Sequence, residues 1–153
     1  MKTQNIITIT AILFSALSLR ADDSAKLAKL PPAAAEALKK AAGSATIEKV
    51  SIEKDGKTTV YEIDLVEAGK PNREVSVTAD GKLHAEEETV PLEKVPAGAK
   101  KSIEAGAKGA KIERVNRIKR ANGELTYEAL YSAKGKKTEV EFFEDGKQKP
   151  EEK

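Results

Sequence analysis

The residues best suited to chemistry lie between positions 84 and 88. His84 is the only histidine of the chain, and three glutamates occupy positions 86–88. Residues two apart on a strand project from the same face, so His84 and Glu86 could offer two metal ligands side by side. No cysteine or second histidine completes a transition-metal site, and the glutamates lack the loop spacing of calcium sites. We interpret the segment as a solvated acidic edge strand, with metal or calcium binding as the alternative.

Other catalytic chemistry is not indicated by the residue types present. A nucleophile needs a base beside it, and the chain has no cysteine and one histidine, which lies in a charged stretch. A glycine-rich phosphate loop of the usual spacing is absent from the sequence. Carboxylates are so common that any pair of them carries no information. The sequence predicts a protein that is not an enzyme, with no catalytic residue, no cofactor and no metal.

Two clusters are better suited to contacting another protein. A basic cluster lies within residues 114–120, but no aromatic side chain is interleaved with it for base stacking, so nucleic acid is not an expected partner. Phe142 and Phe143 are adjacent, and a strand must point them to opposite faces. Phe142 takes a core position, which leaves Phe143 facing outward as a contact residue, with cover by the chain's own tail as the alternative. The predicted partner-binding residues are Phe143, Glu141, Arg117 and Lys119.

The elements that must position these residues belong to a unit that occurs twice, at an offset of 65 residues. Leu30-Pro31 matches Val95-Pro96 at the start of the unit, and Asp80-Gly81 matches Asp145-Gly146 at its end. The few gaps fall beside glycine-rich or lysine-rich stretches, where loops tolerate insertions. We interpret this pattern as a duplication, with a first unit at residues 30–88 and a second at residues 95–147.

Each unit is predicted to be a helix followed by strands. Starting prolines and alanine-rich residues predict helices over Ala33–Ala42 and Ala97–Ala107. Alternating apolar and polar residues then predict strands with one face toward a core and one toward water. The fold class is α+β, with two tandem α-β-β-β-β units and the helices on one face of the antiparallel sheet. The predicted strands are 50–55, 61–65, 75–78 and 82–87 in the first unit, and 114–120, 125–131 and 138–143 in the second.

Both ends of the chain are predicted to lie outside these units. Residues 1–21 have the order of a secretory signal peptide, with a basic start, an apolar run and Ala21 at the cut. The apolar run is shorter than the roughly 20 residues that span a bilayer, so we expect no stable membrane insertion after cleavage, with a retained anchor as the alternative. Residues 22–29 are expected to be a polar lead-in. The second unit has a shortened last strand, and residues 148–153 are expected to be a disordered tail.

The charges of the mature chain are balanced but unevenly placed. Cleavage after residue 21 removes Lys2 and Arg20 from the 27 basic residues and none of the 25 acidic ones, which leaves no net charge. The first unit has an excess of acidic residues and the second an excess of basic ones. Attraction between the two units, or self-association through the oppositely charged halves, is therefore expected to be sensitive to salt. The sequence does not specify an oligomeric state.

The motifs of the repeated unit resemble the PepSY domain. They are a Leu-Pro-x-Ala helix start, an Ile-x-x-Val strand, an x-Gly hairpin, a strand with Tyr61-Glu62 or Tyr127-Glu128, and an Asp-Gly turn. The tandem, signal-bearing form is similar to the β-lactamase-inhibitor-like PepSY-like proteins of bacteria, and the match covers Leu30 to Lys147. The resemblance implies an exported bacterial protein with a non-catalytic role. It transfers no site residue, because no inhibitory motif matches.

From the residues and the resemblance together we expect a periplasmic or secreted binding protein. PepSY units occur in propeptides of secreted metallopeptidases and in envelope proteins, where control of peptidases has been proposed. The expected function is to modulate or inhibit a peptidase or another envelope enzyme through the exposed face of the sheet. The alternative is a metal-binding or calcium-binding envelope protein that uses the acidic strand around His84.

Overall fold

The structure is a computed structural model that describes residues 21–150. The predicted signal peptide, residues 1–21, therefore lies outside the described residues except for Ala21. Within the described residues, no helix combines the length and the apolar character that crossing a bilayer requires.

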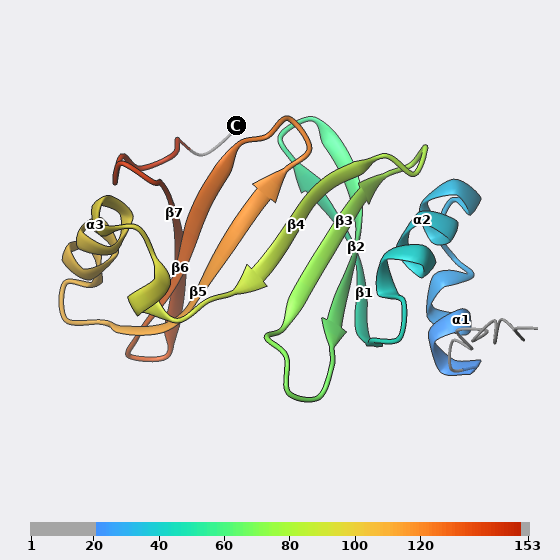
Figure 1. The fold of residues 1–153 in the computed structure, drawn as a ribbon, viewed down its shortest axis with the longest axis horizontal. Coiled ribbons are helices and arrows are strands. Elements are labelled where there is room, and N and C mark those ends of the chain that lie inside the picture. The colour runs from blue at the N-terminus through green and yellow to red at the C-terminus, as the bar shows by residue number, and fades with distance from the viewer. Residues whose placement is uncertain (1–20, 151–153) are drawn as a thin grey trace, which may run out of the picture.

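The strands of the described chain form one antiparallel sheet in which each strand pairs with its neighbours in sequence (Figure 1). β4 pairs with β5, so the two predicted units share a single sheet. The α+β class and the antiparallel pairing are confirmed, and the continuity of the sheet across the linker was not predicted. The seven strands are β1 (Thr46–Asp55), β2 (Thr58–Val66), β3 (Arg73–Thr78), β4 (Leu83–Thr89), β5 (Lys111–Arg120), β6 (Leu125–Ala133) and β7 (Lys136–Phe143).

The helices begin where proline can start them. α2 (Pro32–Ala42) and α3 (Ala97–Ala107) each directly follow a proline, whose missing N–H falls among donors that a helix leaves unpaired. A short 3-10 helix, η1 (Leu92–Lys94), lies in the link between the halves. A further helix, α1 (Ala21–Leu27), replaces most of the predicted polar lead-in. It is stabilised because Leu27 is buried in the core. The sequence did not indicate this contact, because most of the residues around Leu27 are polar or charged.

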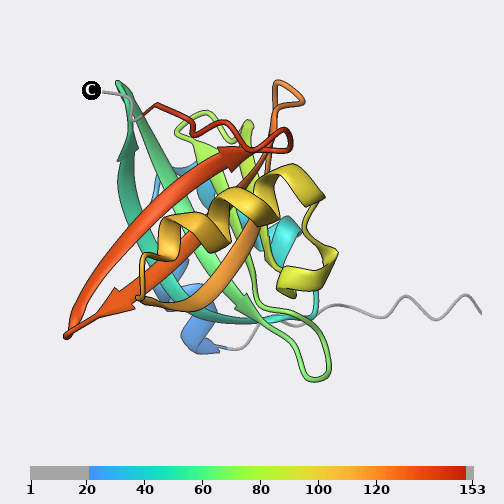
Figure 2. The same ribbon diagram turned by 90° about the vertical axis from the view of Figure 1, so that its left-hand side faces the viewer.

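The sheet curves so that its outer face carries a helix at each end and its inner, concave face carries none of the described helices (Figures 1 and 2). Directly paired residues of neighbouring strands point to the same face of a sheet. By this rule the register places Ile63, Val75, Tyr127 and Phe142 on the outer face, under the helices. The prediction that the helices cover one face is therefore confirmed.

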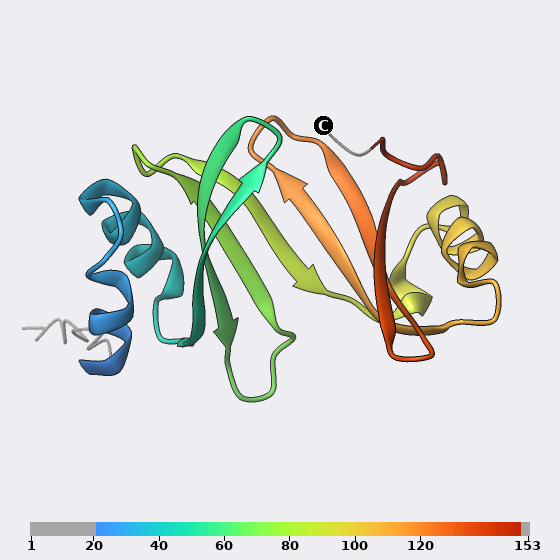
Figure 3. The same cartoon turned by 180° about the vertical axis from the view of Figure 1, so that it is seen from behind.

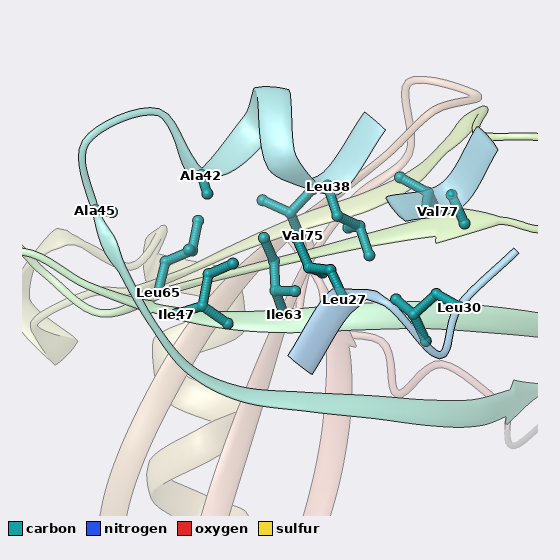
Figure 4. Close-up of a cluster of buried hydrophobic side chains, with 11 residues drawn as sticks. Leu27, Leu30, Leu38, Ala42, Ala45, Ile47, Ile63, Leu65, Val75 and Val77 are labelled. Carbon is teal, nitrogen blue, oxygen red and sulfur yellow. The ribbon is translucent and has the colours of Figure 1, made fainter. Parts of the chain in front are cut away.

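Two apolar clusters hold the helices against the sheet. In the first half Leu38 of α2 is fully buried against residues of β1, β2 and β3 (Figure 4). In the second half Ile103 of α3 is fully buried as well, and its carbonyl accepts a hydrogen bond of 2.9 Å from the Tyr131 hydroxyl. Burying one such aliphatic side chain contributes about 1.5–3 kcal/mol, so each helix is stabilised mainly by its contact with the strands.

The two halves also share local irregularities at the 65-residue offset. β1 has a register shift between Ile47 and Lys49, and β5 has one between Ile112 and Arg114. The Asp-Gly turns at residues 80–81 and 145–146 each pack against the start of the helix of their own half. A side chain could not fit there, because a Cβ at either glycine would lie 2.6 or 2.5 Å from a helix carbonyl oxygen.

The C-terminal residues 148–150 differ from the expected disordered tail. Gln148 forms an isolated bridge with Phe142, and the Lys149 N–H donates to the Glu141 carbonyl at 2.8 Å. The Lys149 ammonium lies 3.3 Å from Glu124 and 3.7 Å from Glu141. These contacts were missed because Glu124 and Glu141 come close to Lys149 only in the folded chain. Residues 151–153 lie outside the described part.

Candidate functional site

The concave face of the sheet gathers acidic side chains from both halves of the molecule. The register pairs Asp64 with Glu74, and Glu74 with Glu87, in a row across β2, β3 and β4. Glu62 lies two residues from Asp64 on β2 and therefore points to the same face. Glu128 of β6 pairs with Asn116 of β5, and Asn116 pairs with Thr89 of β4. Because Thr89 is two residues from Glu87, Glu128 also points to this face. We call Glu62, Asp64, Glu74, Glu87 and Glu128 the acidic face. All five of these residues line a hollow of about 260 Å³.

The four glutamates of the acidic face, Glu62, Glu74, Glu87 and Glu128, all have a raised pKa. Burial, followed by repulsion from Glu74, Glu128 and Glu62, raises the pKa of Glu87 to about 8. Burial and neighbouring carboxylates likewise raise the pKa of Glu62 to about 7 and that of Glu128 to about 7. The pKa of Glu74 is also raised, chiefly by burial. Near neutral pH this surface is therefore only partly ionised and gains negative charge as pH increases.

Three members of the acidic face lie especially close together. Carboxylate oxygens of Glu62, Asp64 and Glu74 all lie within 4.8 Å of one another. The Asp64 Oδ1 atom is buried and has no hydrogen-bond partner among the described residues. Two cationic side chains, Lys49 and Arg114, also line the hollow that holds these groups. The arrangement can attract a positively charged group, which would relieve the repulsion among the carboxylates.

One end of the concave face is closed by ion pairs. The turns after β1 and β5 lie side by side there (Figures 1 and 3). His84 Nε2 lies 2.6 Å from Asp55 Oδ2, and this hydrogen bond is the main reason that the Asp55 pKa is lowered. Arg120 contacts Glu141 with two nitrogens, at 2.7 and 3.1 Å, and Glu124 at 3.1 Å.

At this closed end the Glu141 carboxylate is bound by side chains of the protein itself. Burial disfavours its charge, but hydrogen bonds from Arg120 and Thr126 bring the Glu141 pKa below its ordinary value. The carboxylate also has the Lys149 ammonium nearby. Glu141 therefore stays ionised and neutralised, in contrast to the carboxyl groups of the acidic face.

The predicted partner-binding residues do not form one surface. Glu141 and Phe143 belong to the concave face, because their partners on β6 are Glu128 and Thr126. Arg117 pairs with Tyr127 and Lys119 with Glu86, which places both basic residues on the outer face. Arg117 forms an ion pair of 2.6 Å with Glu88 there. The four residues were grouped by type, and the sequence did not show which face each would take.

The acidic strand of residues 84–88 is not the edge strand that we expected, because β4 pairs with both β3 and β5. Its side chains are divided between the two faces. Glu87 joins the acidic face, whereas Glu86 and Glu88 pair with Lys119 and Arg117 on the outer face. His84 is engaged by Asp55 at the closed end. The metal-site alternative that combined His84 with all three glutamates is therefore wrong, because alternation along β4 separates its ligands.

Sequence reasoning missed the acidic face, although a signal for it was present. The Tyr-Glu pair occurs in both copies, and its tyrosine packs on the outer face while Glu62 and Glu128 point to the concave one. Glu62, Asp64 and Glu74 alternate with core residues in β2 and β3. Reading the polar positions of the strands together, as the apolar positions were read, would have found one acidic surface.

The fold is similar to several solved bacterial structures. A protein from Bacteroides eggerthii described as periplasmic has a TM-score of 0.59 and 19% identity, over 78% of this chain and 85% of that chain. A BLIP-like protein from Bacteroides fragilis has a TM-score of 0.53 and 23% identity, over 81% and 87%. A DUF2874 family protein from Bacteroides ovatus has a TM-score of 0.55 and 13% identity, over 78% and 84%.

These likenesses define the class of the protein by its fold. An open antiparallel sheet with helices on one face is an α+β fold, and it is similar to the folds of the BLIP-like protein and of the DUF2874 family protein. No protein-family model matches the chain, and no curated protein matches it either.

Proposed function

We propose that this chain is an exported, non-enzymatic binding protein whose acidic face holds a basic segment of a protein partner. The observation that carries the proposal is the convergence of five carboxyl groups from four strands on one concave surface. Three of them have a pKa of about 7 or 8, because they are buried beside one another. A lysine or arginine side chain of the partner would add positive charge to a hollow in which Lys49 and Arg114 are outnumbered by the carboxyl groups.

The energetics favour a cation from a protein over a free monovalent ion. Removing water from the charged carboxylates is costly, and a single monovalent ion offers only one positive charge in return. A bound protein segment excludes water as well, but it provides several cationic groups at fixed positions. A cation placed among Glu62, Glu74 and Glu87 lowers their pKa values and so releases protons. Binding should accordingly become tighter as pH rises through about 7–8, the values to which burial raises the pKa of Glu62 and Glu87.

The export and the partner class are supported by the sequence and by the fold. Residues 1–21 have the pattern of a signal peptide, and one structural neighbour is described as periplasmic. Another neighbour is named BLIP-like, which agrees with the resemblance to the β-lactamase-inhibitor-like PepSY-like proteins. We propose a peptidase or another envelope enzyme as the partner, which this protein modulates or inhibits.

The tandem origin of the two halves belongs to the same proposal. The shared register shifts, the buried Leu38 and Ile103, and the matching contacts of Gly81 and Gly146 support descent from one duplicated unit. Duplication would explain why the acidic face is assembled from Glu62 in one half and Glu128 in the other.

Phe143 is proposed as an apolar contact at the margin of the concave face. It is half-buried and pairs with Thr126, on the side of the sheet that faces the proposed partner. The Phe143→Ser variant should weaken binding to an identified partner. Unchanged affinity would exclude Phe143 as a contact.

The experiment that tests the proposed function is capture of partners from a bacterial envelope fraction. The mature protein should retain a basic protein, and the Glu62→Gln/Glu128→Gln variant should lose it. The Glu36→Gln/Glu104→Gln variant is the matched control, because it makes the same charge change at exposed positions on α2 and α3. Equal retention by both variants would overturn the assignment of the acidic face.

Calorimetric titration with calcium, zinc and copper separates this proposal from an ion-binding function. Our proposal predicts no strong binding of any of the three ions. Tight calcium binding that is lost in Asp64→Asn would instead favour the ion-binding alternative, because Asp64 lies among the three closest carboxylates.

A further inference from the structure

β1 forms an open edge of the sheet. In the described chain β1 pairs with β2 alone, and Figure 3 shows it at the margin of the first half. The opposite edge strand, β7, is partly covered by residues 148–149. On β1 the Lys26 ammonium donates to the Ile47 carbonyl at 2.8 Å. Cover from α1 therefore reaches the start of the edge, and residues 49–55 continue beyond it.

The sequence of this edge is complementary to itself when it is read in the opposite direction. Residues 48–54 are Glu-Lys-Val-Ser-Ile-Glu-Lys. In an antiparallel pair of two copies centred on Ser51, Lys49 of each copy meets Glu53 of the other, and Glu48 meets Lys54. Val50 meets Ile52, so the apolar positions also match. Moving the centre to Val50 removes both charge matches, and moving it to Ile52 leaves one per strand, between Lys49 and Asp55.

The backbone of β1 is compatible with this register. Asp55 and Thr58 flank a two-residue turn and so form a hydrogen-bonded pair with each other. Because backbone groups alternate along a strand, those of Ile52 and Val50 point away from β2. In the pairing centred on Ser51, Val50 faces Ile52 of the other copy. Both residues then present their free backbone groups to each other, as a hydrogen-bonded pair requires.

The side chains at this edge are available for such a contact. Ile52 is 61% exposed, which is unusual for a large apolar residue in this structure. The charged residues at positions 48, 49, 53 and 54 are exposed as well. Beside the strand lies a groove of about 490 Å³, lined by α1, Leu30, Val50 and Ile52. In the proposed pairing, Ile52 of the second copy would lie opposite Val50, contact this groove and be buried.

We propose that two copies of this protein pair through their β1 edges in antiparallel orientation, with the two-fold axis at Ser51. The pairing extends the sheet from one molecule into the next and is isologous, so it closes after two copies. An interface of one strand from each copy is small, and the dimer is therefore of the weak, reversible class. This contact lies at the β1 margin of the acidic face, because Lys49 and Glu53 also line the hollow and the Ser51 hydroxyl donates to Glu62 at 3.3 Å. Self-association of the unbound protein tests it separately from the proposed function.

Sedimentation of the mature protein from about 1 µM to about 1 mM should show a reversible monomer–dimer equilibrium. The Lys49→Glu variant brings glutamates 49 and 53 opposite each other, so the dissociation constant should rise by about tenfold or more. The Lys49→Glu/Glu53→Lys variant restores opposite charges across the interface and should recover the dimer. Lys101→Glu, the same charge change on exposed α3, should leave dimerisation unchanged.

The register can be tested directly by cross-linking, because the chain has no cysteine. In the proposed dimer the two Ser51 residues form a non-hydrogen-bonded pair, whose close approach suits a disulfide. Ser51→Cys should form a covalent dimer on mild oxidation, and Lys101→Cys should not do so at the same concentration. A monomer at all concentrations, or equal cross-linking of the two variants, would overturn the proposal.

Discussion

Individual carboxyl groups of the acidic face should make the stability of the protein depend on pH. The pKa of Glu87 is raised from 4.5 to about 8 by burial and by neighbouring carboxylates. Between these values the folded chain binds more protons than the unfolded chain, so the free energy of unfolding falls as pH rises. Below about 4.5 this contribution is fully present, and it is lost as pH rises through about 8. Denaturant unfolding at a series of pH values will measure the slope.

Glu87→Gln should reduce this pH dependence. The amide keeps the shape of the side chain but has no charge to desolvate, so the variant should gain about 1–2 kcal/mol near the upper end of the range. Glu86→Gln is the control, because the neighbouring Glu86 is exposed on the outer face. Equal slopes for Glu87→Gln and the wild type would show that Glu87 ionises freely.

Tyr127 should contribute strongly to stability through packing. It is 5% exposed and belongs to the core under α3. Tyr127→Ala should lower the free energy of unfolding by about 3–5 kcal/mol. Tyr61 is the equivalent residue of the first half but is only partly buried, so Tyr61→Ala should cost less. A change in Tm of a degree or less for Tyr127→Ala would contradict the core assignment.

Among the elements, the Asp-Gly turn after β7 is fixed by its contact with α3. Gly146 has a φ of +86°, and a Cβ there would lie 2.5 Å from the Gly98 carbonyl oxygen. Gly146→Ala should therefore lower the free energy of unfolding by more than about 2 kcal/mol, because strain and collision add. Gly123 has a φ of +88° and open space around it, so Gly123→Ala isolates the backbone cost of about 1 kcal/mol. Equal losses in urea unfolding would show that the contact with α3 does not matter.

The elements were largely predictable from the sequence because their signals are local. Proline and alanine located α3 at Ala97–Ala107, and alternation located the strands to within a few residues. α1 was missed because its burial depends on Leu27, which joins a core formed with residues that follow later in the sequence. The pairing of β4 with β5 was missed because it depends on how the two halves meet. That pairing also determines which residues form the acidic face. It places Glu87 near Glu128, and it places Arg117 and Lys119 on the outer face.

At the scale of the whole molecule, the continuous sheet separates two kinds of surface. The outer face has two apolar cores with a band of paired charges between them, such as Arg117 with Glu88. The carboxyl groups of the acidic face form no ion pair among the described residues, and Lys49 and Arg114 are the cationic side chains that line their hollow. The similar numbers of basic and acidic residues in the sequence, 27 and 25, therefore do not reveal how unevenly the charges are divided between the two faces.

Salt should weaken the binding of a basic partner and leave the fold intact. At about 0.15 M salt, charges are screened over about 8 Å, which reduces attraction toward the concave face. The apolar cores under α2 and α3 do not depend on this attraction. Affinity for the captured partner should fall as salt is raised from low ionic strength, while circular dichroism stays the same. Salt-independent binding would indicate an apolar contact instead.

The most direct measurement is an NMR titration of the mature protein with a short oligoarginine peptide. Our account predicts shifts at the amides of Glu62, Glu74, Glu87 and Glu128, which weaken at low pH and disappear in Glu62→Gln/Glu128→Gln. Shifts that instead spread over the outer face, or that persist unchanged in the variant, would contradict the assignment of the concave face as the binding surface.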